Sequence, residues 1–164
     1  MTESPRQVAI CGDGDPRTPH AEAARTAGRL IAEAGAVLLT GGMTGVMAAA
    51  SEGARAAGGL VVAVLPGGST KSAVAPAQVR IATGAGEARN VVLVRSADAV
   101  VAIGGAFGTL SEIAIARKLE VPVVGYQTWE APVPGTGEPL LEQCDSIEEA
   151  VARALTAAED GAGT

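Results

Sequence analysis

Three glycine-bearing segments each come directly after a short run of apolar, mostly β-branched residues. They read "CGDGDP" at 11–16, "TGGMTGVM" at 40–47 and "IGGAFGTLSE" at 103–112. An amphipathic stretch with helical spacing follows each of them. Uninterrupted apolar runs are typical of parallel strands that are covered on both faces. The repeated order of strand, glycine loop and helix therefore predicts an open parallel sheet.

The same alternation extends over nearly the whole chain. Strands are expected at 7–12, 36–42, 60–68, 79–83, 99–105 and 121–126. Helices are expected at 20–34, 44–57, 86–97, 108–119 and 146–158, the last with a capping box formed by Ser146 and Glu149. Segments 66–77 and 127–142 are interpreted as loops, the first over the carboxyl ends of the strands.

This pattern predicts an α/β fold, a Rossmann-like doubly wound and mainly parallel sheet with helices on both faces. The length of 164 residues and the even composition predict a single domain over 6–158. A flexible tail is expected at 159–164. The alanine-rich helix at 44–57 could pack against a partner chain as readily as against its own sheet, and a homo-oligomer, a dimer or a tetramer, is expected.

Composition and charge argue against several kinds of partner. The chain carries 12 basic and 18 acidic side chains, a formal net charge of −6, and only 2% aromatic residues. A chain with no basic run and few stacking side chains is a poor candidate for nucleic-acid binding. No apolar segment is long enough to span a membrane. We therefore expect a cytoplasmic protein with no nucleic-acid or membrane partner.

The cysteines and the one histidine do not form a metal-binding pattern. Cys11 and Cys144 lie far apart and show no CxxC spacing, so we expect two free, partly buried thiols. His20 is the only histidine. No metal site and no resident cofactor are predicted.

The glycine loops predict a site for a small anion. Loops that follow parallel strands meet at one edge of the sheet, and free amides at the start of the next helix attract negative charge. The loop with Gly104, Gly105, Gly108 and Thr109 is interpreted as a phosphate cradle, to which Thr109 adds a hydroxyl donor. Neither GxxxxGK[ST] nor a clean GxGxxG is present. Other candidate ligand-binding residues are Gly12, Gly41, Gly42, Thr44, Gly45 and Asn90.

Two charged side chains flank this loop in the predicted fold. Glu112 falls in the first turn of a helix, where it could simply complement the helix dipole or could serve a second task beside the anion. Arg89 begins another helix that follows a strand, and a solvated surface cation is its alternative interpretation. Asp13 and Asp15 are interpreted as turn formers before Pro16 in preference to ligand contacts.

These motifs resemble a known family. "GGAFGTLSE" is similar to the PGGxGTxxE motif of the LOG family, with Ile103 in place of the leading proline, and "GEARNVVLVRSAD" resembles the arginine-bearing helix of that family. The loop "TGGMTGVM" is one residue shorter than its LOG counterpart. Together with "GEARN" it resembles a sister branch that includes molybdenum cofactor carrier proteins, with a more distant likeness to the DNA-processing protein DprA.

The resemblance implies a function as well as a fold. LOG proteins are phosphoribohydrolases that cleave nucleoside 5′-monophosphates to free base and ribose 5-phosphate. By motif match, Glu112 and Arg89 would be catalytic, and the loop that ends at Thr109 would hold the 5′-phosphate. The sister branch implies a non-catalytic carrier of a nucleotide or of molybdenum cofactor. A structural oligomer with vestigial loops is the third interpretation.

Overall fold

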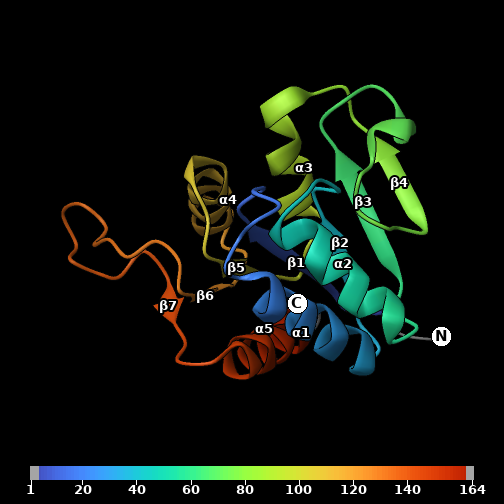
Figure 1. The fold of residues 1–164 in the computed structure, drawn as a ribbon. Helices are drawn as coiled ribbons and strands as arrows, with labels where there is room; N and C mark the ends of the chain where they lie inside the picture. The colour runs from blue at the N-terminus through green and yellow to red at the C-terminus, as the bar shows by residue number, and fades with distance from the viewer. Residues whose placement is uncertain (1–3, 162–164) are drawn as a thin grey trace.

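The computed structural model describes residues 4–161 and contains one seven-stranded sheet within them (Figure 1). Every pair of neighbouring strands is parallel, and the order is β4-β3-β2-β1-β5-β6-β7. The strands are β1 Gln7–Gly12, β2 Val37–Thr40, β3 Val61–Leu65, β4 Val79–Ala82, β5 Ala99–Ile103, β6 Val123–Tyr126 and β7 Glu142–Gln143. The predicted parallel α/β sheet is confirmed.

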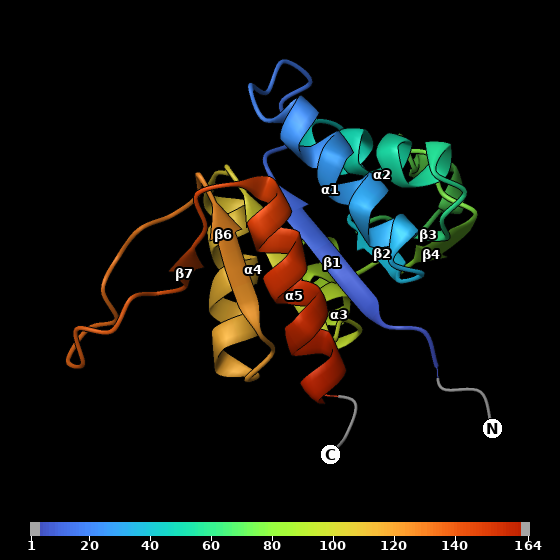
Figure 2. The ribbon, with the colours of Figure 1, turned by 90° about the horizontal axis from the view of Figure 1, so that it is seen from below.

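Helices cover both faces of the sheet, as expected for a doubly wound fold (Figure 2). The helices are α1 Ala21–Glu33, α2 Val46–Ala56, α3 Arg89–Arg95, α4 Phe107–Lys118 and α5 Ile147–Gly161. One face packs its apolar side chains against α1, α2 and α5, and the other face packs against α3 and α4. Alternate residues of β1 point to opposite faces of the sheet. Val8 and Ile10 pack into the core beneath α1, α2 and α5, and Ala9 packs into the core beneath α3 and α4.

Three local expectations are corrected by the structure. The segment expected as a helix at 86–97 begins with a 3₁₀ turn, Gly86–Ala88, before α3. The connection at 127–142 extends away from the sheet and then ends in β7, a two-residue strand that pairs with β6 (Figure 1). Helix α5 continues to Gly161, so residues 159–161 are helical where a tail was expected. The remaining tail residues, 162–164, lie outside the described residues.

The first two helices approach each other through glycines. A Cβ on Gly28 of α1 would collide with the backbone carbonyl of Ala50 in α2, and a Cβ on Gly53 would collide with that of Arg25. Ala50 and Ala54 are completely buried within this chain. The alanine-rich face of α2 therefore packs against α1 and the sheet of its own chain. The sequence had left open whether this face packs against its own sheet or against a partner chain.

The chain reverses its direction of winding between β1 and β5. From β1 it proceeds to β2, β3 and β4 on one side, and β5, β6 and β7 then follow on the other side. The carboxyl ends of β1 and β5 therefore form the topological switch point, where a crevice opens because the following loops diverge. The register places Gly12 beside Ile103 at this edge.

Candidate functional site

A small cavity lies at the carboxyl ends of β1 and β5, at the switch point. Its volume is about 160 Å³. The starts of three helices meet there: Met47 from α2, Arg89 and Asn90 from α3, and Gly108 and Thr109 from α4. The remaining lining residues are Gly12, Asp13, Gly14, Glu87, Ala106 and Glu112. The N-terminus of α4 carries partial positive charge and Arg89 a full one, and Asp13, Glu87 and Glu112 bring three carboxyl groups to the same cavity.

The start of α4 has backbone donors to offer. Ala106 at the N-cap position makes no side-chain capping bond, and the first bond of the helix runs from the Leu110 amide to the Ala106 carbonyl. The amides of the first turn therefore have no acceptor within the helix. The Thr109 hydroxyl oxygen in that turn is buried and has no hydrogen-bond partner within the described part of the chain.

Arg89 is fixed by backbone carbonyls of the turn after β2 and of strand β3. Its Nη1 atom donates to the carbonyl oxygen of Gly41 at 2.8 Å and to that of Val64 at 2.9 Å. The Nε atom of Arg89 is buried and has no partner within residues 4–161. The guanidinium is thus held in place while one of its donors is left for another molecule.

Asn90 is also oriented by its neighbours. The Ser111 hydroxyl donates to the Gly108 carbonyl at 2.7 Å, so its oxygen is free to accept from Asn90 Nδ2, which lies 2.9 Å away. This fixes which end of the amide is the donor. The other end, the Asn90 Oδ1 atom, is buried and unpartnered in the described chain. It can accept a hydrogen bond from a ligand hydroxyl or N–H group.

Glu112 is a buried carboxyl group at the same cavity. Burial raises its pKa to about 7, the adjacent Cys11 thiol and the Arg89 guanidinium lower it, and the Glu87 carboxylate raises it. Burial likewise raises the pKa of the Cys11 thiol, with Glu112 adding to the effect. Glu112 can therefore exist near neutral pH in either protonation state, whereas Cys11 remains a thiol.

The structure brings together half of the residues that the sequence singled out. The candidates that line the cavity are Gly12, Arg89, Asn90, Gly108, Thr109 and Glu112. Gly104 and Gly105, which were expected in the cradle, do not line it. They line a second hollow of about 350 Å³ on the other side of the loop, together with His20 and Trp129.

The remaining candidates shape the backbone around the cavity. Gly41 supplies a carbonyl to Arg89, and Gly42 adopts a positive φ of 71° at the end of β2. The Thr44 hydroxyl donates to the carbonyl oxygen of Gly14, and Gly45 packs its backbone against the same loop. None of these four residues lines the cavity, so each acts on the site through other residues.

The sequence analysis missed three of the residues that line the cavity and gave a fourth, Asp13, only a turn-forming role. Met47, Glu87 and Ala106 carried no signal of their own, although Glu87 lies two residues before Arg89 in "GEARN". Asp13 does form the expected turn, because its Oδ1 atom accepts the Asp15 amide at 3.2 Å. Its Oδ2 atom accepts the Thr18 hydroxyl at 2.8 Å, and the residue also lines the cavity.

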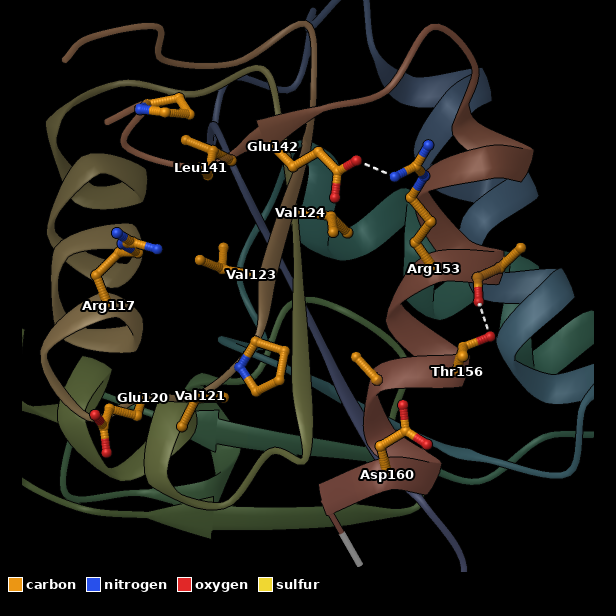
Figure 3. A pocket seen from close by; sticks show the side chains of 14 residues that line it. Arg117, Glu120, Val121, Val123, Val124, Leu141, Glu142, Arg153, Thr156 and Asp160 are labelled. Carbon is orange, nitrogen blue, oxygen red and sulfur yellow. Dashed lines mark hydrogen bonds and ion pairs between the residues drawn. The ribbon is translucent and has the colours of Figure 1, made fainter. Parts of the chain in front are cut away.

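A larger cavity lies elsewhere and has a different character (Figure 3). It measures about 880 Å³ and lies between α4, α5 and the edge of β6. Figure 3 shows Val121 and Val123 beside it, and the ion pair between Arg153 and Glu142 at its margin. It contains none of the glycine-loop candidates, so the converging helix starts single out the smaller cavity.

Two further features of the described residues concern membranes and metals. No helix in this part of the chain is long and apolar enough to cross a membrane. Residues 4–161 contain no group of three or more His, Cys, Asp or Glu side chains arranged to hold a metal ion. Cys11 and Cys144 are both free and buried.

The parallel sheet, the glycine loops and the cavity at the switch point define a Rossmann-like α/β protein with a candidate site at its switch point. The chain belongs to the SLOG cluster4 family, whose model matches residues 5–158. This confirms the branch of LOG-like proteins that "GGAFGTLSE" and "GEARN" indicated. An uncharacterized protein of Archaeoglobus fulgidus is 44% identical over 137 residues, which cover 77% of this chain and 89% of that protein.

Solved structures agree with this assignment. The molybdenum cofactor binding protein of the phototrophic bacterium Rippkaea orientalis is 34% identical, with a TM-score of 0.84 over 94% of this chain and 98% of the other. The DNA processing protein A of Helicobacter pylori, described with a single-stranded DNA binding mode, is 20% identical. Its TM-score is 0.66 over 93% of this chain and 81% of the other, and at that identity the likeness shows the fold alone.

Proposed function

We propose that this protein binds a phosphorylated small molecule that carries a flat heterocyclic ring, either a pterin of the molybdenum cofactor type or a nucleoside monophosphate. The observation that carries the proposal is the set of three buried and unpartnered polar atoms at one cavity: Arg89 Nε, Asn90 Oδ1 and Thr109 Oγ1. An unpaired buried polar group costs about 1–3 kcal/mol. A ligand that pairs with these atoms would recover that free energy on binding.

The chemistry of the three atoms indicates what the ligand offers. Arg89 Nε is a donor and the Thr109 hydroxyl can donate, so both suit the oxygen atoms of a phosphate group. Asn90 Oδ1 only accepts, so it suits a hydroxyl or N–H group next to that phosphate. A phosphate ester of a polyhydroxylated or nitrogen-rich molecule has both features. The likeness to a molybdenum cofactor binding protein supports this ligand class.

Calorimetry with AMP and with molybdenum cofactor tests the proposal. We expect at least one of them to bind, and we expect Asn90→Asp to weaken binding about tenfold or more, because it adds a carboxylate to a cavity that already holds Asp13, Glu87 and Glu112. Thermal unfolding of the variant without ligand checks that the fold is retained. If the wild-type protein binds neither ligand, the proposal is wrong, and the interpretation as a structural oligomer with vestigial loops takes its place.

One observation favours hydrolysis as a second candidate function. The cavity that attracts a phosphate also contains Glu112, whose pKa of about 7 leaves it partly ionised at neutral pH. As a carboxylate, Glu112 could stabilise the positive charge that develops on a ribose when its bond to the base breaks, and could orient a water molecule toward C1′. The base would leave with the bonding electron pair, the water oxygen would bond to C1′ and give up a proton, the base would take up a proton, and ribose 5-phosphate would remain.

Product analysis separates binding from hydrolysis. The protein is incubated with AMP, and free adenine is measured by chromatography beside a Glu112→Gln sample. Adenine release that depends on Glu112 supports the phosphoribohydrolase. AMP binding without adenine release leaves the carrier function. The predicted homo-oligomer stays a prediction, which light scattering of the purified protein tests.

A further inference from the structure

The cavity at the switch point is too small for a complete nucleotide or pterin phosphate. Its volume is about 160 Å³, whereas pockets that enclose a whole drug-sized ligand begin at about 300 Å³. The site can therefore hold the phosphate end and part of the adjoining group. If the proposed function is correct, the flat ring of the ligand lies outside this cavity, against its rim.

An aromatic pair, the exposed Phe107 and the half-buried Trp129, lies at the loop that borders the cavity. Phe107 lies between Ala106 and Gly108, which both line the cavity, and its side chain is 78% exposed. Its ring centroid lies 5.7 Å from that of Trp129, with a tilt of 36° between the ring planes. These residues are the one phenylalanine and the one tryptophan of the chain. Both lie at the loop that begins α4, although aromatic residues are rare in this chain.

Trp129 is held against this loop by several contacts. Its Nε1 atom donates to the Ala106 carbonyl at 3.0 Å, and Gln143 Nε2 donates to the carbonyl of Trp129 itself at 3.0 Å. The preceding residue, Thr128, donates its hydroxyl to the Gly104 carbonyl. Trp129 also borders the second hollow of about 350 Å³ on the other side of the loop. Trp129 is therefore fixed against the loop, with Phe107 beside it and open space next to it.

We propose that Phe107 and Trp129 form the ring-binding part of the site, on which the flat heterocycle of the ligand stacks while its phosphate occupies the cavity at Arg89 and Thr109. The inference rests on the proposed function and adds to it the surface that binds the ring of the ligand. Stacking on an aromatic side chain suits any planar heterocycle, because the contact is made with the face of the ring and needs no hydrogen bond to particular atoms at its edge. It thus favours ligands with a ring over simple sugar phosphates.

The single tryptophan makes the proposal directly measurable. Tryptophan fluorescence is recorded while the protein is titrated with AMP or with ribose 5-phosphate, which lacks the ring. We expect AMP to change the emission and to bind about tenfold more tightly than ribose 5-phosphate. Phe107→Ala is expected to weaken AMP about tenfold and to leave the affinity for ribose 5-phosphate, measured by calorimetry, within about twofold. Phe107→Tyr, which keeps an aromatic face, should restore the affinity for AMP.

A matched control and three opposing outcomes complete the test. Leu60→Ala truncates another exposed apolar residue, 42% exposed and just before β3, and should change neither affinity. If Phe107→Ala binds AMP as tightly as the wild type, the ring contact is refuted while the phosphate site stands. If neither AMP nor ribose 5-phosphate binds the wild type, stacking of a nucleotide ring is refuted, and the calorimetry with molybdenum cofactor decides whether the proposed function fails as well. If Phe107→Ala changes the molar mass in light scattering without changing AMP affinity, the pair belongs to an interface between chains.

Discussion

The Nη1 atom of Arg89 lies 2.8 Å from the carbonyl oxygen of Gly41, and this hydrogen bond joins residues that are 48 positions apart. Because Gly41 has no side chain, the guanidinium can lie directly against its backbone. A Cβ at position 41 would collide with Arg89 Nη1 and would lie 2.8 Å from the sulfur of Met47. The turn after β2 thereby sets the position of a side chain on α3.

Gly41→Ala is therefore expected to weaken ligand binding without unfolding the protein. The atoms that the new methyl group meets are the ends of flexible side chains, so Arg89 and Met47 can shift while the backbone stays in place. We expect AMP affinity to fall about tenfold in calorimetry. Gly68→Ala is the matched control, since a Cβ there meets nothing within 4 Å. Equal affinities in the two variants would contradict the positioning role of Gly41.

Thr109→Val should change stability and binding in different ways. Valine has nearly the shape of threonine, and the hydroxyl it lacks is buried and unpaired within the described chain. We expect the free energy of unfolding without ligand to stay the same or rise by about 1 kcal/mol. Affinity for AMP should fall about tenfold or more, because a hydrogen bond to a charged phosphate is lost.

Urea unfolding and calorimetry on the same Thr109→Val sample check both expectations. Thr109→Ser keeps the hydroxyl and should bind AMP nearly as tightly as the wild type. A Thr109→Val protein with undiminished AMP affinity would show that the hydroxyl does not contact the ligand.

Glu112 is expected to make stability fall as pH rises. Its pKa is raised from 4.5 to about 7 in the folded protein, so between these values the unfolded chain has lost a proton that the folded chain keeps. Stability is highest below the unfolded pKa and is lost as pH rises through the folded pKa. The total effect is about 3 kcal/mol.

Urea unfolding of wild type and Glu112→Gln isolates that contribution. The stability of the variant relative to the wild type should increase by about 3 kcal/mol between about pH 4.5 and about pH 8, because other titrating groups are common to both proteins. A difference that does not change with pH would mean that Glu112 titrates alike in the folded and unfolded chains.

Gly28→Ala should destabilise the protein although alanine is the better helix former. In an exposed helix the exchange would stabilise by about 1 kcal/mol. Here the new Cβ collides with the Ala50 carbonyl of α2, a backbone atom that cannot move without separating the helices. We expect a net loss of about 1–3 kcal/mol in urea unfolding. A more stable variant would indicate that α1 and α2 lie farther apart than described.

The sequence predicted the fold well because its signals are local. The apolar runs and the glycine-bearing segments that follow them located β1 through β6 and the five α-helices of the described chain within a few residues. The predicted Ser146 cap is present, because Ser146 Oγ accepts the Glu149 amide at 3.1 Å, but the Glu149 carboxylate accepts the amide of Asp145 and not that of Ser146. Strand β7 escaped prediction because two residues carry too little periodicity to recognise.

Residues of the candidate site could be predicted from the sequence, but their arrangement in space could not. The sequence by itself determined that glycine loops follow parallel strands and that Arg89 and Glu112 lie on helices beside them. The expected place of Glu112 in the first turn of its helix is wrong, because α4 begins at Phe107 and carries Glu112 in its second turn. Only the tertiary structure decided that α2, α3 and α4 begin at one cavity, that Gly104 and Gly105 face a different hollow, and that Phe107 meets Trp129 at the rim. Those relations depend on strand order and on close approaches between distant segments, which local periodicity does not encode.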